Sequence, residues 1–155
     1  MKLSKRSEYA LRALIDVGMA EQFGRPKLQI SEIAEKENIP VKYLEHLMLT
    51  LRNSGFLVSK RGKDGGYSLG KPAEAIKIGQ VIRLLDGPLA PISCVSQTAY
   101  QKCNCPDEAH CGLRMLMLDV RNSIANILDN HSLAEIVEIT LRKIKKDKAA
   151  QPFKL

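Results

Sequence analysis

The sequence has few aromatic residues and no long apolar run, and both absences narrow the class of protein. Aromatic residues make up 5% of the 155 residues, while the hydrophobic fraction of 45% and the charged fraction of 26% are typical of a folded globular chain. No stretch is long and apolar enough to span a bilayer. The first residues, MKLSKRSEYALRALIDVG, carry charges among their apolar positions, unlike a signal peptide. We therefore expect a cytoplasmic protein without a membrane partner.

Two catalytic motifs are also absent. The sequence has no C-x-x-C motif and no glycine-rich dinucleotide-binding loop. A thiol redox enzyme that uses Cys103 and Cys105 is therefore a weaker alternative than a protein that is not an enzyme. Because thiols stay reduced in the cytosol, disulfides are the less expected use of the four cysteines.

Positive charge is concentrated at the two ends of the chain. Residues 1–71 contain 13 Lys and Arg against 8 Asp and Glu, residues 72–141 contain 5 against 8, and residues 142–155 contain 6 against 1. This distribution suits a phosphate-binding N-terminal region, although charge alone is weak support for DNA binding.

The N-terminal third has the pattern of a helix-turn-helix. Apolar residues at helical spacing predict a first helix capped by Ser4 or Ser7 and ended by Gly24, followed by a short second helix that ends at Asn38. The sequence Asn-Ile-Pro at 38–40 is typical of a tight turn, and a third helix is predicted from about Val41 to Asn53.

A hairpin follows the third helix. Residues 56–61 and 67–69 predict two strands, and the glycine-rich residues 62–66 predict the turn between them. A hairpin at this place is a wing. The fold class is therefore mainly α with a small β-hairpin, a winged helix-turn-helix domain joined to a long C-terminal dimerisation helix.

The second half of the chain divides into three parts. A short helix around 78–85 ends the DNA-binding domain, which we place at residues 1–90. Residues 91–112 hold all four cysteines and almost no aliphatic residues, so this loop is not expected to pack by itself. A dimerisation helix and a last helix fill 113–141, and 142–155 is expected to be a flexible basic tail.

The helix after the turn is expected to enter the major groove of DNA, since that groove admits a helix and displays a full donor and acceptor code. Its polar residues off the buried stripe, together with two cations of the wing, are the candidate DNA contacts, although each is also acceptable as an ordinary solvated side chain. They are Lys42, Tyr43, Glu45, His46, Arg52, Arg61 and Lys63.

The cysteines are candidate metal ligands. Cys94, Cys103, Cys105 and Cys111 fall within eighteen residues, and thiolates are soft ligands for iron–sulfur clusters, zinc or copper. Structural zinc sites usually present paired C-x₂-C-like spacings, and this loop has none. The spacing favours a loop that wraps a larger inorganic centre, with a zinc-stabilised or purely thiol-based sensor as the alternative.

Three segments together carry a family resemblance. KRSEYALRALIDVG, VKYLEHLMLTLRNSGF and RGKDGGYSLGKPAEAIKIGQVIRLLDG resemble the IscR/NsrR class of bacterial regulators, the Rrf-two family, over residues 1 to about 141. The resemblance implies a dimeric winged-helix transcription factor that senses iron–sulfur, iron, redox, nitric oxide or cysteine status. It also implies that Tyr43, Glu45 and His46 read the groove and that Arg61 is the wing arginine.

The same resemblance implies an iron–sulfur cluster, either [2Fe–2S] or [4Fe–4S]. Cys94, Cys105 and Cys111 match the three cysteines of the cluster-binding members, and Cys103 is an extra thiol. Those members have a histidine three residues after the last cysteine, where this chain has Arg114, so the fourth ligand stays open between Cys103, His110 and a group of the partner subunit. The expected partners are a second copy of the chain and a palindromic DNA operator, because a dimer meets two half-sites.

Overall fold

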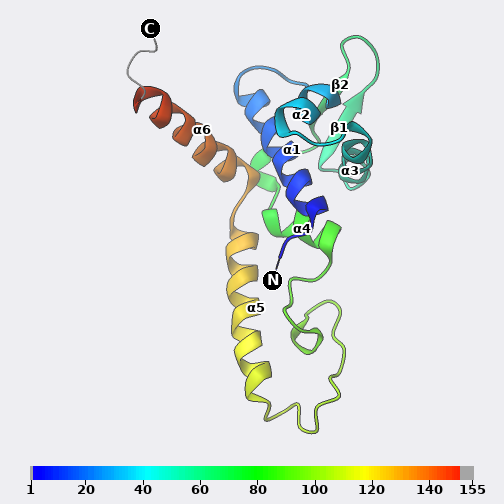
Figure 1. Cartoon of the computed structure of the whole chain (residues 1–155), viewed down its shortest axis with the longest axis vertical. Helices are drawn as coiled ribbons and strands as arrows, with labels where there is room; N and C mark the ends of the chain where they lie inside the picture. Colours follow the sequence, from blue (N-terminus) through cyan, green and yellow to red (C-terminus); the bar gives the residue numbers. More distant parts are fainter. Residues whose placement is uncertain (1, 151–155) are drawn as a thin grey trace.

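The computed structural model describes residues 2–150 and places a compact head above a long arm (Figure 1). The head contains three helices, a two-stranded sheet and a fourth helix, and the arm contains the cysteine loop and a fifth helix. The elements are α1 (Lys5–Gln22), α2 (Ile30–Glu37), α3 (Val41–Asn53), β1 (Leu57–Lys60), β2 (Gly66–Leu69), the 3₁₀ turn η1 (Ala73–Ala75), α4 (Ile78–Asp86), the 3₁₀ turn η2 (Ser93–Val95), α5 (Gly112–Asn130) and α6 (Leu133–Ala150).

Local sequence signals set the ends of the first three helices. The Ser4 side chain accepts a hydrogen bond from the Ser7 backbone and caps α1, which selects between the two predicted caps. Asn38 ends α2 with a left-handed backbone (φ 52°), and Pro40 then precedes α3, whose bounds are those predicted. The helix-turn-helix and the fold class are confirmed.

The core of the head lies between α1, α3 and α4. Leu14, Leu44, Met48 and Leu51 are fully buried, and burying each such side chain stabilises the fold by about 1.5 to 3 kcal/mol. The stripe predicted on α3 is therefore the face that this helix turns to the core. The polar residues of α3 are left on the opposite side.

The wing is a regular antiparallel hairpin whose register runs from Leu57 opposite Leu69 to Lys60 opposite Gly66. Gly62 and Gly66 have positive φ angles of 104° and 141°, which require glycine at the turn. An additional contact was not predicted: Leu28 forms a β-bridge with Tyr67, with N–O distances of 3.0 and 2.7 Å. This bridge fixes the start of α2 beside the wing.

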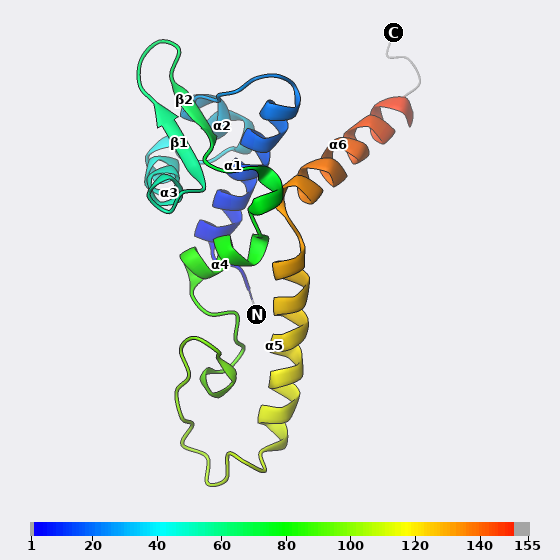
Figure 2. The same cartoon turned by 180° about the vertical axis from the view of Figure 1, so that it is seen from behind.

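The chain enters the arm through the cysteine loop and returns to the head along α5. Both views show α5 beside this loop and below α4 (Figures 1 and 2). Arg83 of α4 and Asp129 of α5 form a bidentate ion pair at 2.5 and 2.8 Å. The Ile78 backbone N–H donates to His131 O at 3.1 Å, and Leu133 N–H donates to Ile76 O at 2.8 Å. These contacts attach the C-terminal end of α5 to the head.

The last helix is longer than predicted. Its first turns pack on α1, where Val137 lies against Gly18 so closely that a Cβ there would be 2.8 Å from the Val137 Cγ2. We expected the helix to end near residue 141, but α6 continues to Ala150. Ion pairs at i,i+4 spacing, Glu138–Arg142 at 2.6 Å and Lys143–Asp147 at 2.9 Å, support the exposed extension. The remainder of the predicted tail, 151–155, lies outside the described residues.

Among residues 2–150, none of the helices combines the length and the hydropathy needed to cross a bilayer.

Candidate DNA interface and cysteine site

The exposed face of α3 carries the predicted groove-reading residues. Lys42 has a side chain that is 93% exposed and lies 3.7 Å from the Glu45 carboxylate. His46 and Arg52 are also exposed on this helix. The structure therefore gathers four of the candidate contacts on one surface, free of the core.

Tyr43 is held more firmly than its neighbours. Its ring meets the Tyr9 ring of α1 edge-on, with centroids 5.8 Å apart. The guanidinium of Arg12 lies 5.3 Å from the centre of the Tyr9 ring. This stack holds the ring at the start of α3 while 38% of Tyr43 stays exposed.

A groove runs between the end of α3, the wing and the start of α2. Its volume is about 410 Å³, and Arg52 Nη1 donates to Ser59 Oγ of β1 at 3.4 Å across it. Arg61 lines the groove, whereas Lys63 is exposed at the tip of the turn. The structure therefore places Arg61 of the wing next to Arg52 of α3.

Sequence reasoning missed two residues of this groove, Gln29 and Lys60. Gln29 is the N-cap of α2, and its backbone N–H donates to Glu32 at 2.9 Å in a capping box. The signal was the Q-x-x-E spacing at 29–32. The Leu28–Tyr67 bridge, which brings this cap to the wing, has no local sequence signal.

A network of charged side chains connects α1 to α2. Arg12 Nε donates to Glu37 at 2.6 Å, and Lys36 donates to the buried carboxylate of Asp16. Burial raises the pKa of Asp16 to about 6, against the opposing effect of Lys36. Burial also acts to raise the pKa of Glu37, but the hydrogen bond from Arg12 and neighbouring charges outweigh it and lower that pKa.

The four predicted cysteine ligands are in three different environments. Cys94 is 5% exposed within η2, next to the buried Val95. Cys111 is the N-cap of α5, and its sulfur accepts a hydrogen bond from Arg114 N at 3.4 Å. Cys103 and Cys105 are joined by a disulfide.

One expectation for this loop is corrected. We expected thiols in preference to disulfides, but the sulfurs of Cys103 and Cys105, only two positions apart, form a disulfide. The loop was not expected to pack by itself, and η2 buries Cys94 and Val95 where it lies against α5. This long-range packing on α5 is not indicated by local composition.

A carboxylate, Glu108, lies inside the loop. Tyr100 Oη donates to it at 2.7 Å, Arg114 Nε lies 3.4 Å away, and Cys103 Sγ is 4.0 Å from it. The hydrogen bond to Glu108 is the main cause that raises the pKa of Tyr100. Sequence reasoning named Arg114 as a departure from the resembled family but did not find Glu108.

His110 points to other partners. Its Nδ1 is 2.7 Å from Asp107 Oδ2, and its side chain is 84% exposed. Within residues 2–150 no three His, Cys, Asp or Glu side chains converge closely enough to bind a metal ion as they stand. The loop gathers sulfur donors without presenting a finished coordination site.

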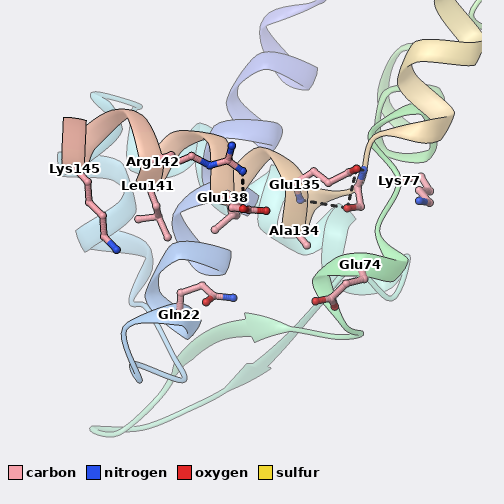
Figure 3. A pocket seen from close by; sticks show the side chains of 11 residues that line it. Gln22, Glu74, Lys77, Ala134, Glu135, Glu138, Leu141, Arg142 and Lys145 are labelled. Atoms are coloured by element: carbon pink, nitrogen blue, oxygen red, sulfur yellow. Dashed lines mark hydrogen bonds and ion pairs between the residues drawn. The ribbon is translucent and has the colours of Figure 1, made fainter. Parts of the chain in front are cut away.

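A further cavity, of about 730 Å³, lies between the end of α1, η1 and α6 (Figure 3). It is lined by both signs of charge, including the Glu138–Arg142 pair and Lys145, and by Leu141. None of the candidate DNA-binding residues or cysteines lines it.

Comparisons with known proteins agree with this architecture. Residues 3–139 match the Rrf2 family, described as an iron-dependent transcriptional regulator. A putative HTH-type transcriptional regulator, rrf2-like, of Rhodobacter capsulatus is 37% identical over 137 residues, which cover 87% of this chain and 91% of that protein. The HTH-type transcriptional regulator IscR of Yersinia pseudotuberculosis is 35% identical over 88% of this chain and 79% of its own length.

Among solved structures, CymR of Bacillus subtilis, titled the global cysteine regulator, is similar with a TM-score of 0.75. It is 29% identical, over 90% of this chain and 98% of its own. Relatives and structural neighbours are thus transcriptional regulators with the same winged helix-turn-helix fold. The chain belongs to the Rrf2 family of transcriptional regulators.

Proposed function

We propose that this regulator binds its operator under the control of an iron–sulfur cluster held by the cysteine loop, and so reports iron–sulfur, iron, redox or nitric oxide status. The observation that carries the proposal is the presence of four cysteines in the loop that precedes α5, with Cys111 as the N-cap of this long helix. Likeness to IscR supports it. In this proposal residues 1–90 bind DNA, 91–112 hold the cluster and 113–141 dimerise.

The DNA contacts follow from the exposed face of α3 and from the wing. The N-terminal turn of α3 enters the major groove, where Tyr43, Glu45 and His46 face base edges and Lys42 contacts phosphate. Arg61 enters the adjacent minor groove, and Lys63 and Arg52 contact the backbone on either side of it. In this arrangement α3 and the wing lie on either side of one DNA strand.

A homodimer is supported by α5. None of its 19 residues, all within the described part of the chain, is buried. Leu113, Leu116 and Ile127 are 60%, 57% and 57% exposed. With Val120 and Ile124 they recur at close to 3.5-residue spacing, the seam of a coiled coil. A symmetric pair of such helices buries this seam and presents two α3 helices to a palindromic operator.

The cysteines fit a cluster by donor chemistry. Reduction of the Cys103–Cys105 disulfide gives four thiolates with those of Cys94 and Cys111, and thiolates are the usual ligands of both common cluster types. A bound cluster supplies a redox-active anionic centre. Cys111 caps the N-terminus of α5, and Cys94 belongs to η2. A metal centre bound by both cysteines would therefore fix the loop on the N-terminal end of α5.

The head receives this change through the opposite end of α5. The Arg83–Asp129 ion pair and the backbone bonds around His131 fix that end to α4. A change in the angle of α5 in the dimer therefore changes the spacing of the two α3 helices. Operator affinity depends on this spacing.

A thiol-based regulator without a cluster is the second candidate. The disulfide between Cys103 and Cys105 and the likeness to a cysteine regulator favour it. In that case opening and closing the disulfide replaces cluster gain and loss. Bound zinc would stabilise the loop and would not itself change oxidation state.

Anaerobic purification tests the two candidates. We expect visible absorbance, with iron and sulfide in stoichiometric amounts, and loss of both in each of the single variants Cys94→Ala and Cys111→Ala. Operator duplexes selected by the protein from random DNA then report affinity by fluorescence anisotropy at fixed salt. Colourless, iron-free protein whose affinity changes with thiol oxidation would establish the second candidate. Equal affinities with and without a cluster would end the first.

A further inference from the structure

The cysteine loop contains one enclosed ion pair. The side chains of Glu108 and Arg114 are 19% and 33% exposed, whereas those of the neighbouring His110 and Asp107 are 84% and 57% exposed. The loop therefore turns one charged pair inward and the other outward. A partly buried ion pair loses hydration, so it is stable only where other groups form hydrogen bonds with both side chains.

Its partners are the cysteines and Tyr100. Arg114 Nε donates to the Cys94 carbonyl at 3.3 Å and lies 3.4 Å from Glu108, while the Arg114 backbone donates to Cys111 Sγ at 3.4 Å. Glu108 lies 4.0 Å from Cys103 Sγ. The Arg114–Glu108 pair therefore contacts Cys94 through its backbone carbonyl and Cys103 through its sulfur, and the Arg114 backbone is bonded to the Cys111 sulfur.

The electrostatics of a thiolate site favour a cation beside it. Four thiolates around one divalent cation leave two net negative charges, and a cluster bound by four thiolates is also anionic. Arginine cannot lose its proton and cannot ligate a metal, so its contribution here is charge and hydrogen bonds. Glu108 has the opposite effect, because it neutralises that cation and adds a negative charge beside the sulfurs.

We propose that Arg114 is the counter-charge of the cysteine site and that Glu108 restrains it. When the thiolates hold a soft metal centre, Arg114 directs its guanidinium to them, and its pairing with Glu108 weakens. This proposal rests on the proposed use of the cysteines as ligands. It assigns to Arg114 a function other than that of the histidine ligand in the resembled regulators.

The two residues are therefore expected to act in opposite directions. Arg114→Gln removes the positive charge and weakens metal binding. Glu108→Gln leaves Arg114 without a competing carboxylate and strengthens metal binding. If the ion pair only braced the loop, both substitutions would loosen it and weaken metal binding alike.

Titration of the reduced full-length protein with Cd²⁺ measures this directly, through the ultraviolet absorbance of cadmium–thiolate bonds. We expect Arg114→Gln to weaken Cd²⁺ binding by about tenfold or more, the usual effect of losing a partner outside the ligands. Arg114→Lys keeps the charge and should stay within a few-fold of the wild type. Glu108→Gln should bind more tightly than the wild type.

The exposed Glu138–Arg142 pair on α6 provides matched controls. Its separation is 2.6 Å, and Arg142→Gln and Glu138→Gln make the same charge changes far from the cysteines. Both should leave Cd²⁺ affinity unchanged. Equal weakening by Arg114→Gln and Glu108→Gln, no effect of Arg114→Gln, or a matching effect of the control pair would overturn the proposal. Iron-free native protein would sink the cluster proposal alone, because the cadmium titration needs only the thiols.

Discussion

The head and the arm of this regulator differ in what holds them together. In the head, side chains such as Leu14, Leu44 and Leu51 are completely buried within one chain. In the arm, α5 has no buried residue, and the loop beside it depends on Cys94, Val95 and a few polar contacts. The head has a buried core of its own, whereas the apolar side chains of α5 are left exposed, and the proposed function covers them with a second copy.

Truncating a buried side chain should produce the largest difference in stability between a substitution in the head and one in the arm. Leu44→Ala leaves a cavity in the head and should lower the free energy of unfolding by about 2 to 5 kcal/mol. Leu116→Ala, on the exposed seam of α5, should lower the free energy of unfolding of the undimerised chain by less than about 0.5 kcal/mol. Urea denaturation followed by circular dichroism measures both. Similar losses in the two variants at low protein concentration would remove the distinction.

A charge on the seam should disrupt the arm without unfolding the head. Leu116→Glu places a carboxylate between two apolar helices, so we expect the dimer to dissociate at concentrations where the wild type does not, with operator affinity lowered about tenfold or more. Sedimentation velocity reports the assembly. Asn126→Glu, on an exposed position off the seam, is the control. A dimeric Leu116→Glu protein would argue for another interface.

Substitutions on the head should change DNA binding and leave the arm intact. Arg61→Ala should cost about 1 to 3 kcal/mol of operator binding and reduce sequence preference, since an arginine in a groove reads its shape. Lys63→Ala should weaken binding to all DNA sequences equally and lower the salt dependence of the binding constant by about one released ion. Anisotropy titrations over a range of salt distinguish them. Lys148→Ala on α6 is the control, and identical salt slopes for all three would refute the assignment.

The smallest expected effect lies within the head, at Asp16. Its pKa is about 6 in the folded chain against an ordinary 3.8, so the folded chain binds the extra proton between these values. The free energy of unfolding should therefore fall as pH rises from about 4 to 6. Asp16→Asn should remove most of this decrease. Urea midpoints at pH 4.5 and 7 measure it, with exposed Glu138→Gln as control. An unchanged pH dependence would contradict burial as the cause.

Sequence reasoning succeeded where the signal was local. The turn at Asn38, the start of α3 after Pro40 and the glycines of the wing follow from backbone preferences of single residues. The exposure of Lys42, His46 and Arg52 follows from the helical period that buries Leu44 and Met48. The head was therefore predicted nearly element by element.

Many of the failures come from contacts between residues that are separated in the sequence, whereas the Cys103–Cys105 disulfide is local. The Leu28–Tyr67 bridge, the burial of Cys94 against α5 and the enclosure of Glu108 by Tyr100 and Arg114 each join segments that no periodicity connects. The extension of α6 past residue 141 carries the ion pairs Glu138–Arg142 and Lys143–Asp147, with Ile144 as the apolar residue that follows Leu141 on its stripe. Most of the cysteine site belongs to this class, so its residue types were predictable and its arrangement was not.

The Arg83–Asp129 pair makes α5 a lever with one fixed end. A helix of 19 residues is about 28 Å long, so a tilt of about 5° about the fixed end displaces the other end by roughly 2.5 Å. Conversely, a sulfur–sulfur rearrangement of that size at the loop rotates the whole head by a few degrees. Under the proposed function, an ångström-scale displacement at Cys111 is thereby converted into an angular change at the distant surface proposed to meet the duplex.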